Sequence, residues 1–206
     1  MRRRLGGTFS GQYVFPGGVV DSSDYAETRV TENPHILVMQ HRKRFGSAEK
    51  AQGFWVAAIR ETFEECGILV AYDANRDYLA GQVDVFAAER NALNDKRLGF
   101  NAFLAQQGLT LAIDQVAYMT RKITPTFVPK RFDTHFFLVS VPEAADGSPC
   151  QQELEQALWI TPQAALDRSA HDLPMVHPTL MALRDLVKFD EVDAVMAFYR
   201  ARWGQT

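Results

Sequence analysis

The chain has 206 residues, of which 47% are hydrophobic and 23% charged, a composition typical of one folded domain and not of a disordered or fibrous chain. Its 22 Lys and Arg residues against 25 Asp and Glu residues give a net charge of -3. This balance argues against broad electrostatic binding to nucleic acid or to an anionic membrane. We therefore expect a single domain over residues 1–206 with neither nucleic acid nor a membrane as its partner.

The chain has two cysteines, Cys66 and Cys150, and neither has a second cysteine nearby in the sequence. This predicts neither a disulfide framework nor a zinc site, and it fits a reducing, cytoplasmic location. No apolar run approaches the roughly 20 residues that span a bilayer, and the first residues lack the apolar stretch of a secretory signal. The basic clusters at residues 2–4 and 41–44 are interpreted as solvated surface stretches.

The first predicted element is a short extended segment at residues 12–20, which runs into a Pro16-Gly17-Gly18 turn where the backbone can approach a ligand closely. An irregular, polar stretch follows. Helical spacing then predicts a helix of about 15 residues that ends near Cys66, with Gly67 as its stop. The apolar residues at this spacing are Phe54, Ala57, Ala58, Phe63 and Ile68.

The middle of the chain predicts two helices and then strands. The Ala-rich segments 84–96 and 100–107 indicate helices that serve mainly in packing. The segments 116–123 and 132–141 indicate strands, because they are rich in β-branched and aromatic residues and the second ends at a turn-rich stretch. Residues 158–160 indicate a third, short strand.

The last part of the chain predicts helices. Thr161 is typical of an N-cap, and Pro162 of a first helical position. Two further helices are expected over residues 178–189 and 191–202. Helices mixed with strands and without an internal repeat predict an α/β or α+β fold.

The most informative stretch is Arg60 to Ile68, which reads RETFEECGI. Helix neighbours lie three and four positions apart, so Glu61, Glu64 and Glu65 project from one face of the predicted helix. Like charges at this spacing repel each other, and a cation would relieve the repulsion. Mg²⁺ suits such oxygen ligands and bridges readily to phosphates. The alternative is a solvated acidic face paired with lysines.

This stretch and the glycine turn resemble the Nudix hydrolase family, whose box reads G-x5-E-x7-R-E-U-x-E-E-x-G-U, with U an aliphatic residue. Gly18 and Asp24 match the first half, with Asp in place of Glu, and residues 60–68 match the second half, with Thr62 at the first aliphatic position. Asp24 and Arg60 are separated by 35 residues instead of seven, an insertion of 28 at about 25–52.

A split box of this kind is similar to the branch that includes the peroxisomal coenzyme A diphosphatases. The similarity continues at residues 123–125, at residues 131–137 and in the segment around Trp159. The resemblance implies an α/β/α sandwich with a mixed β-sheet, a catalytic helix and extra C-terminal helices. The family's usual first strand is expected to be absent: either the native chain starts upstream of Met1, or another element or a second subunit, as in a homodimer, completes the open sheet edge.

What the resemblance implies for activity is Mg²⁺-dependent hydrolysis of a diphosphate linkage in a small-molecule nucleotide, with Mn²⁺ able to replace Mg²⁺. Coenzyme A or an acyl-CoA is the first substrate hypothesis. ADP-ribose or a dinucleotide is the alternative among enzymes, and a binding module without catalysis is the alternative outside them.

The resemblance also assigns residues. Glu61, Glu64, Glu65 and the backbone carbonyl of Gly17 would bind the metal, and Glu61 or Glu64 could relay a proton. Arg60 would hold Glu61 in place by a charge-assisted hydrogen bond. Asp24 would cap the inserted segment or pair with Arg60.

The resemblance further implies an acid from a later loop as base or ligand: Glu153 is the candidate, Glu155 is the alternative, and both could instead be solvated loop acids. Two more residues are candidates by position. Arg131 could bind a phosphate, or it could pair with Asp133 on the surface. His177 could line the substrate pocket, since it lies in a loop just before a predicted helix.

Overall fold

A computed structural model of the chain describes residues 1–4, 9–26, 28–31, 45–82, 85–127, 131–143, 145, 147–150, 152 and 154–203. Its helices are η1 (Ser22–Tyr25), α2 (Ala48–Cys66), α3 (Ala87–Asn94), α4 (Phe100–Gln107), η2 (Ile113–Gln115), α5 (Pro162–Arg168), α6 (His177–Leu186) and α7 (Val192–Arg202). Its strands are β1 (Arg2–Arg3), β2 (Ala71–Tyr72), β3 (Thr110–Leu111), β4 (Val116–Ile123), β5 (Asp133–Val139) and β6 (Leu154–Gln156).

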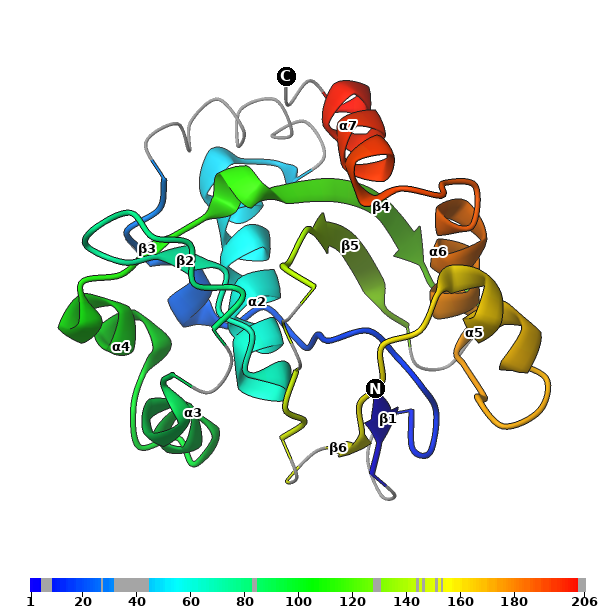
Figure 1. Ribbon diagram of the computed structural model, residues 1–206, viewed down its shortest axis with the longest axis horizontal. Coiled ribbons are helices and arrows are strands. Elements are labelled where there is room, and N and C mark those ends of the chain that lie inside the picture. The colour runs from blue at the N-terminus through cyan, green and yellow to red at the C-terminus, as the bar shows by residue number, and fades with distance from the viewer. Residues whose placement is uncertain are drawn as a thin grey trace.

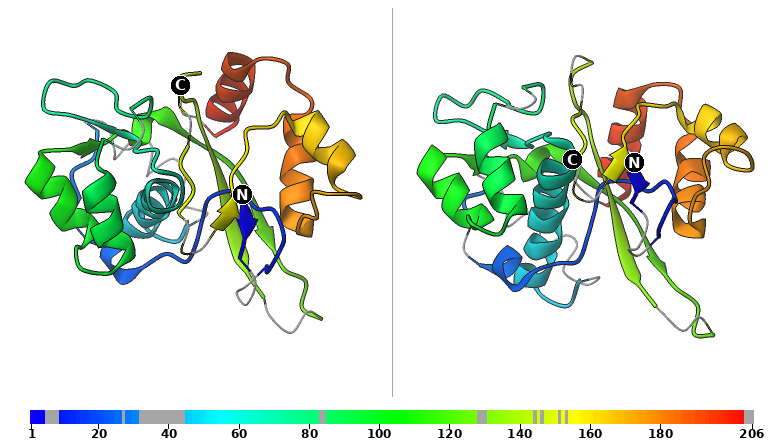
Figure 2. Two further views of the ribbon diagram at one scale, coloured as in Figure 1. Left: turned by 60° about the horizontal axis from the view of Figure 1, so that its bottom comes forward. Right: turned by 90° about the horizontal axis from the view of Figure 1, so that it is seen from below.

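The elements form three layers (Figures 1 and 2). Helices α2, α3 and α4 lie on one side, the β1–β6 and β4–β5 ladders lie in the middle, and α5, α6 and α7 lie on the other side. Among the described residues the three ladders are antiparallel, and two single bridges, Tyr13 with Met175 and Val30 with Leu111, are parallel. Layers and mixed strand directions agree with the expected α/β/α sandwich.

The central helix α2 follows from local sequence signals. The side chain of Ser47 caps its first turn by accepting a hydrogen bond from the Lys50 N–H, and Gly67 ends it in the left-handed conformation at φ 75°. Trp55, Ile59 and Phe63, spaced four apart, are each 1% exposed and face the core. The predicted end at Cys66 is confirmed. The helix is longer than predicted because residues 48–52, counted with the insertion, already belong to it.

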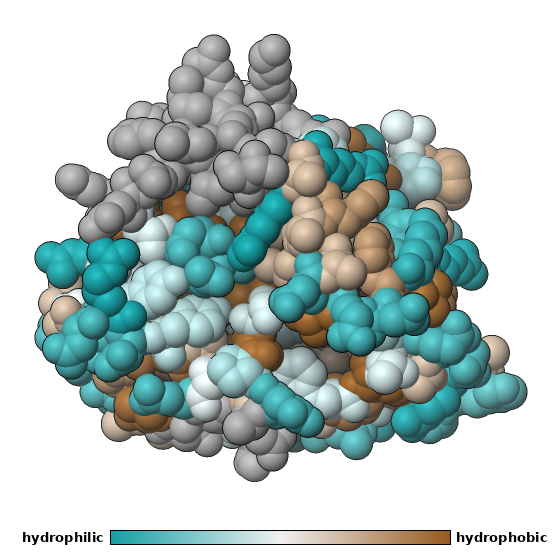
Figure 3. All heavy atoms as spheres, turned by 45° about the horizontal axis from the view of Figure 1, so that its top comes forward, coloured by the Kyte–Doolittle hydropathy of each residue, from teal (hydrophilic) through white to brown (hydrophobic). Residues whose placement is uncertain are grey.

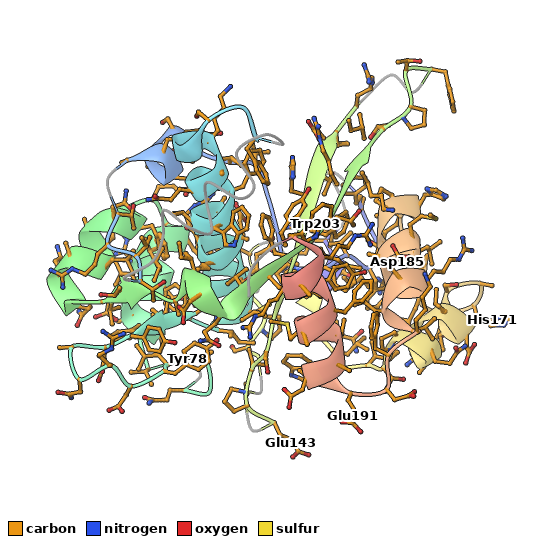
Figure 4. All side chains as sticks on the ribbon, turned by 90° about the horizontal axis from the view of Figure 1, so that it is seen from above. Tyr78, Glu143, His171, Asp185, Glu191 and Trp203 are labelled. Carbon is orange, nitrogen blue, oxygen red and sulfur yellow. The ribbon has the colours of Figure 1, made fainter. Side chains whose placement is uncertain are left out.

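Aromatic side chains join α2 to the sheet. The indole N–H of Trp55 donates to the Val116 carbonyl at 3.1 Å, and the Tyr118 hydroxyl lies 3.1 Å from His135 Nδ1. Trp203, which follows α7, packs edge-on against Tyr118 at 5.4 Å between ring centres (Figure 4). These contacts fix the helix against β4 and β5.

The β4–β5 hairpin confirms two predicted strands. Its ladder runs from Val116 opposite Val139 to Ile123 opposite Asp133, with an irregularity between Tyr118 and Thr120. The far end of the hairpin projects from the body of the protein (Figure 2).

The prediction of a strand at residues 158–160 is wrong. The strand β6 lies four residues earlier, at Leu154–Gln156, and pairs with β1. Backbone partners decide this placement: Leu154 is buried there at 2% exposure, whereas Trp159 is 64% exposed and makes no ladder. The predicted extended segment at residues 12–20 forms only single bridges, through Tyr13. At the start of the chain, Arg2–Arg3 does form a short strand, so this stretch takes part in a sheet.

The remaining helices agree with the sequence. Helix α4 has the predicted bounds, and α3, α6 and α7 begin or end within three residues of theirs. Thr161 caps α5 through its hydroxyl, which accepts from the Ala164 N–H, and Pro162 is the first helical residue. Within the described part of the chain, no helix combines the length and the apolarity that a membrane crossing requires. Figure 3 shows a face on which hydrophilic residues are spread among smaller apolar areas.

Candidate active site

The three carboxylates expected to act together lie on the last two turns of α2. Glu65 is 3% exposed, and Glu61 and Glu64 are half-buried. Their side faces the Gly17–Gly18 turn, while the opposite side of the helix packs into the core. The helix therefore presents its acids to a backbone turn and not to bulk solvent.

The turn touches the helix at two points. The Gly17 N–H donates to Glu65 Oε2 at 2.9 Å. A Cβ added at Gly18 would lie 2.4 Å from Glu61 Oε1, so only glycine allows this approach with Glu61 where it stands. Gly17, where we expect a metal-binding carbonyl, also favours glycine, because its φ of 155° strains any L side chain.

Arg60 organises one side of this acidic face. Its Nε and Nη2 donate to the two carboxylate oxygens of Asp24 at 2.8 and 2.9 Å, and its Nη1 donates to Glu61 at 2.8 Å and to Glu64 at 3.4 Å. Burial works against the charge of Arg60, but the hydrogen bond to Asp24 and the nearby carboxylates outweigh it, so the pKa of Arg60 is raised. The expected Arg60–Glu61 contact is present.

Of the two roles expected of Asp24, the structure shows the pairing with Arg60. Asp24 is 1% exposed, and its Oδ2 also accepts from the Asp21 N–H at 2.7 Å in a capping box of η1. The two halves of the split motif, 35 residues apart in the sequence, are therefore joined by a buried ion pair.

Arg3 organises the other side, and sequence reasoning missed it. Its Nη1 lies 2.5 Å from Glu65 Oε1, and its Nη2 donates to the Gly17 carbonyl at 2.5 Å. The side chains of Arg3 and Glu65 are only 16% and 4% exposed. The interpretation of residues 2–4 as a solvated stretch is wrong for Arg3. The sequence held no signal that separates Arg3 from its two neighbours.

The oxygen atoms at this end of α2 are of the chemical type that binds a divalent cation. Three carboxylates and a backbone carbonyl are the hard oxygen ligands that Mg²⁺ and Mn²⁺ take. Among the described residues, no three His, Cys, Asp or Glu side chains form a group able to hold a metal ion. The three carboxylates are in ion pairs with arginines: Glu61 and Glu64 contact Arg60, whereas Glu65 contacts Arg3. The Arg3 guanidinium thus stands as a cation between Glu65 and the Gly17 carbonyl.

Two side chains of α3 hold the end of α2, and the sequence analysis did not single them out. The buried Arg90 donates from Nε to the Glu64 carbonyl at 3.1 Å, and Asn94 donates to the same carbonyl at 3.3 Å. A cation at the C-terminus of a helix complements its dipole and its unpaired carbonyls. These contacts fix the turn that carries Glu64 and Glu65.

Of the three residues proposed outside the box, Arg131 and His177 are described, and neither contacts this centre in the described part of the chain. Arg131 is exposed and donates to the Thr124 carbonyl across the hairpin at 3.1 Å. Its alternative partner Asp133 is instead paired with Arg121. His177 is the exposed first residue of α6. Glu153 lies outside the described residues.

The chain is similar to known proteins in both sequence and fold. A family model described as the NUDT19 Nudix domain matches residues 1–186. A crystal structure of a NUDIX hydrolase from Alicyclobacillus acidocaldarius superposes with a TM-score of 0.75 and 28% identity, over 95% of this chain and 85% of that one. The layers and the acidic helix facing a glycine turn are those of a Nudix hydrolase. The chain belongs to the NUDT19 Nudix domain family, as the split motif predicted.

Two curated relatives extend the comparison. A protein named putative nudix hydrolase 7, from Caenorhabditis elegans, is 28% identical over 156 residues, which cover 76% of this chain and 43% of that protein. The acyl-coenzyme A diphosphatase NUDT19 of Xenopus laevis is 26% identical over 231 residues, which cover 96% of this chain and 61% of that protein. The chain therefore spans about half the length of these relatives.

Proposed function

We propose that the protein hydrolyses a diphosphate linkage in a nucleoside diphosphate derivative, with Mg²⁺ as the cofactor and Mn²⁺ as a replacement. The observation that carries this proposal is the acidic end of α2, where Glu65 and Glu61 meet the Gly17–Gly18 turn. Membership of a Nudix family supports it.

Each residue at this end of α2 has a role in the proposal. A bound divalent cation would neutralise the diphosphate and lower the pKa of the attacking water. Glu61, Glu64, Glu65 and the Gly17 carbonyl would hold that cation. Arg60 restrains Glu61 and Glu64 by the hydrogen bonds described above.

The proton of the attacking water needs an acceptor, and we assign it to Glu64 or Glu61. Burial raises the pKa of the Glu64 carboxyl, against the opposing effect of Arg60. A carboxylate with a raised pKa accepts a proton more readily at neutral pH. Glu153 stays in the proposal as a further base.

For the substrate we propose coenzyme A or an acyl-CoA. The name of the Xenopus laevis relative supports this choice. An apolar cavity of about 50 Å³ lies beside the segment that leads into the glycine turn, but it is too small to enclose an acyl chain. It is lined by Tyr13, Val14 and Phe15 together with residues of α5 and α6 and the segments before them.

The decisive experiment is a substrate panel with products identified by mass. It contains coenzyme A, acyl-CoAs, ADP-ribose, NADH and dinucleoside polyphosphates, each with Mg²⁺ and with Mn²⁺. Release of 3′,5′-ADP and 4′-phosphopantetheine, or its acylated form, is the expected result. Turnover of ADP-ribose or dinucleotides alone would mean that these compounds, and not coenzyme A, are the substrates. Tight binding without any turnover would indicate a binding module.

The site assignment has its own test. Glu64→Gln and Glu65→Gln should each lower cation-dependent turnover at least about 100-fold, because each removes a charged oxygen ligand. Circular dichroism should show both variants folded. Glu143→Gln is the matched control, since Glu143 is exposed and points outward (Figure 4). Unchanged turnover in both site variants would contradict the assignment.

The domain organisation, location and assembly stay predictions. We propose a single domain with an insertion, located in the cytoplasm and able to form a homodimer. Cell fractionation and light scattering after size-exclusion chromatography test the last two, with separation into a membrane-bounded organelle and a monomer as the contradicting results.

A further inference from the structure

Arg3 occupies the position of a cation between two of the proposed metal ligands. We propose that Arg3 is a positioning residue: it holds Glu65 and the Gly17 carbonyl in place while no divalent cation is bound, and it leaves them when the cation binds. This inference rests on the proposed function, because it takes the acidic end of α2 as a divalent-cation site.

The contacts form a closed ring. Arg3 Nη1 lies 2.5 Å from Glu65 Oε1, Arg3 Nη2 donates to the Gly17 carbonyl at 2.5 Å, and the Gly17 N–H donates to Glu65 Oε2 at 2.9 Å. The planar guanidinium fork suits such a two-point contact. A Glu65 side chain that is only 4% exposed needs a positive partner, because a buried carboxylate without one is strongly destabilising.

The backbone of Arg3 is anchored, so its side chain is the part that can move. The Arg3 N–H donates to the Gln12 carbonyl at 3.1 Å, and its own carbonyl accepts from Gly11 at 3.0 Å. Its strand partner across β1–β6 is Leu154. A long, flexible side chain on a fixed backbone can leave the site without unfolding β1.

The guanidinium and a divalent cation compete for the same oxygens. Arginine keeps its charge at every pH that the protein tolerates, so it cannot lose its proton to make room. Two cations on one carboxylate and one carbonyl would also repel each other. Binding of the divalent cation therefore requires Arg3 to move away.

This competition predicts effects of opposite sign, which a purely structural arginine would not give. Loss of the Arg3 charge should make the cation-free protein less stable, and it should make the divalent cation bind more tightly. If Arg3 only supported the fold, its removal would lower the stability and weaken the binding together.

The test is titration calorimetry with Mn²⁺ on the full chain, together with melting curves in EDTA. The variants are Arg3→Gln and Arg3→Ala, with Arg3→Lys as the conservative change. Arg2→Ala is the matched control, since the Arg2 side chain is 44% exposed and pairs with Glu155. Arg3→Gln keeps most of the side-chain volume and serves if Arg3→Ala does not fold.

We expect Mn²⁺ to bind Arg3→Gln roughly tenfold more tightly than the unaltered protein, with a lower melting temperature in EDTA. Arg3→Lys should fall between the two, and Arg2→Ala should match the unaltered protein. Unchanged or weaker Mn²⁺ binding by both Arg3→Gln and Arg3→Ala would overturn the inference alone. Absence of Mn²⁺ binding by the unaltered protein would overturn the proposed function and the inference with it.

Discussion

Two arginines neutralise the acidic end of α2, and their surroundings differ. Arg60 belongs to the helix itself, is 7% exposed, and contacts three carboxylates and the Val19 carbonyl. Arg3 comes from the short strand β1 and bridges the Glu65 carboxylate and the Gly17 carbonyl. The Arg60 side is a buried network, whereas the Arg3 side is reached by a single long side chain.

The difference separates structural charge from exchangeable charge. On the Arg60 side, Asp24 lies deep in the protein and balances the guanidinium permanently. On the Arg3 side, the partners are the Glu65 carboxylate and the Gly17 carbonyl, both of which we assign to the divalent cation. The same helix can therefore keep its acids together in two ways, one fixed and one open to replacement.

The largest expected effect is on stability and comes from a substitution in the Arg60 network. Asp24→Asn leaves a buried guanidinium without its bidentate partner, and we expect a loss of about 3–5 kcal/mol in the free energy of unfolding. Urea denaturation followed by circular dichroism measures it. The matched control is Asp133→Asn, which removes a bidentate partner from Arg121 in a pair whose side chains are 36% and 48% exposed.

The control should lose no more than about 1 kcal/mol, because exposed ion pairs contribute little. Equal losses for the two variants would show that burial does not distinguish the Arg60 network. A small loss for Asp24→Asn would mean that Glu61 and Glu64 can balance Arg60 without Asp24.

A smaller effect is expected where the glycine turn meets the helix. Gly18→Ala places a methyl group 2.4 Å from Glu61 Oε1, and the flexible carboxylate must move away. We expect less than about 1 kcal/mol of lost stability but roughly tenfold weaker Mn²⁺ binding. Gly99→Ala is the control, since a Cβ there meets no atom within 4 Å. Normal Mn²⁺ affinity in Gly18→Ala would remove Glu61 from the cation site.

Local patterns in the sequence predicted the Arg60 side. Glu61, Glu64 and Glu65 are three and four positions apart, so helix geometry alone places them on one face. The stop at Gly67 and the cap at Thr161 are equally local, because each depends on backbone groups within a few residues. The resemblance to a split box added the partner Asp24 across the insertion.

The Arg3 side could not be predicted in this way. Its position depends on pairing between β1 and β6, which lie about 150 residues apart in the sequence. Apolar character alone favoured residues 158–160 as the strand, but the available backbone partner selected Leu154–Gln156. In the same manner, Arg90 reaches the end of α2 only because α3 packs against it, a contact that no spacing within α3 predicts.

The last prediction requires no substitution and concerns the thiol next to Glu65, on the Arg3 side. Burial raises the pKa of the Cys66 thiol to about 12, with the Glu65 carboxylate adding to the shift. Because the thiolate is the reactive form, Cys66 should alkylate slowly at pH 8, and its rate should stay low until the pH approaches that pKa. Cys150 is only partly buried.

We expect iodoacetamide to label Cys66 at least about 100-fold more slowly than Cys150 in the folded protein, and both at similar rates in urea. Peptide mass spectrometry of timed samples measures the two rates. Fast labelling of Cys66 in the folded protein would mean that the end of α2 opens to solvent on the Arg3 side. In that case Arg3 would hold a surface carboxylate, and the contrast with the buried Arg60 network would rest on helix position alone.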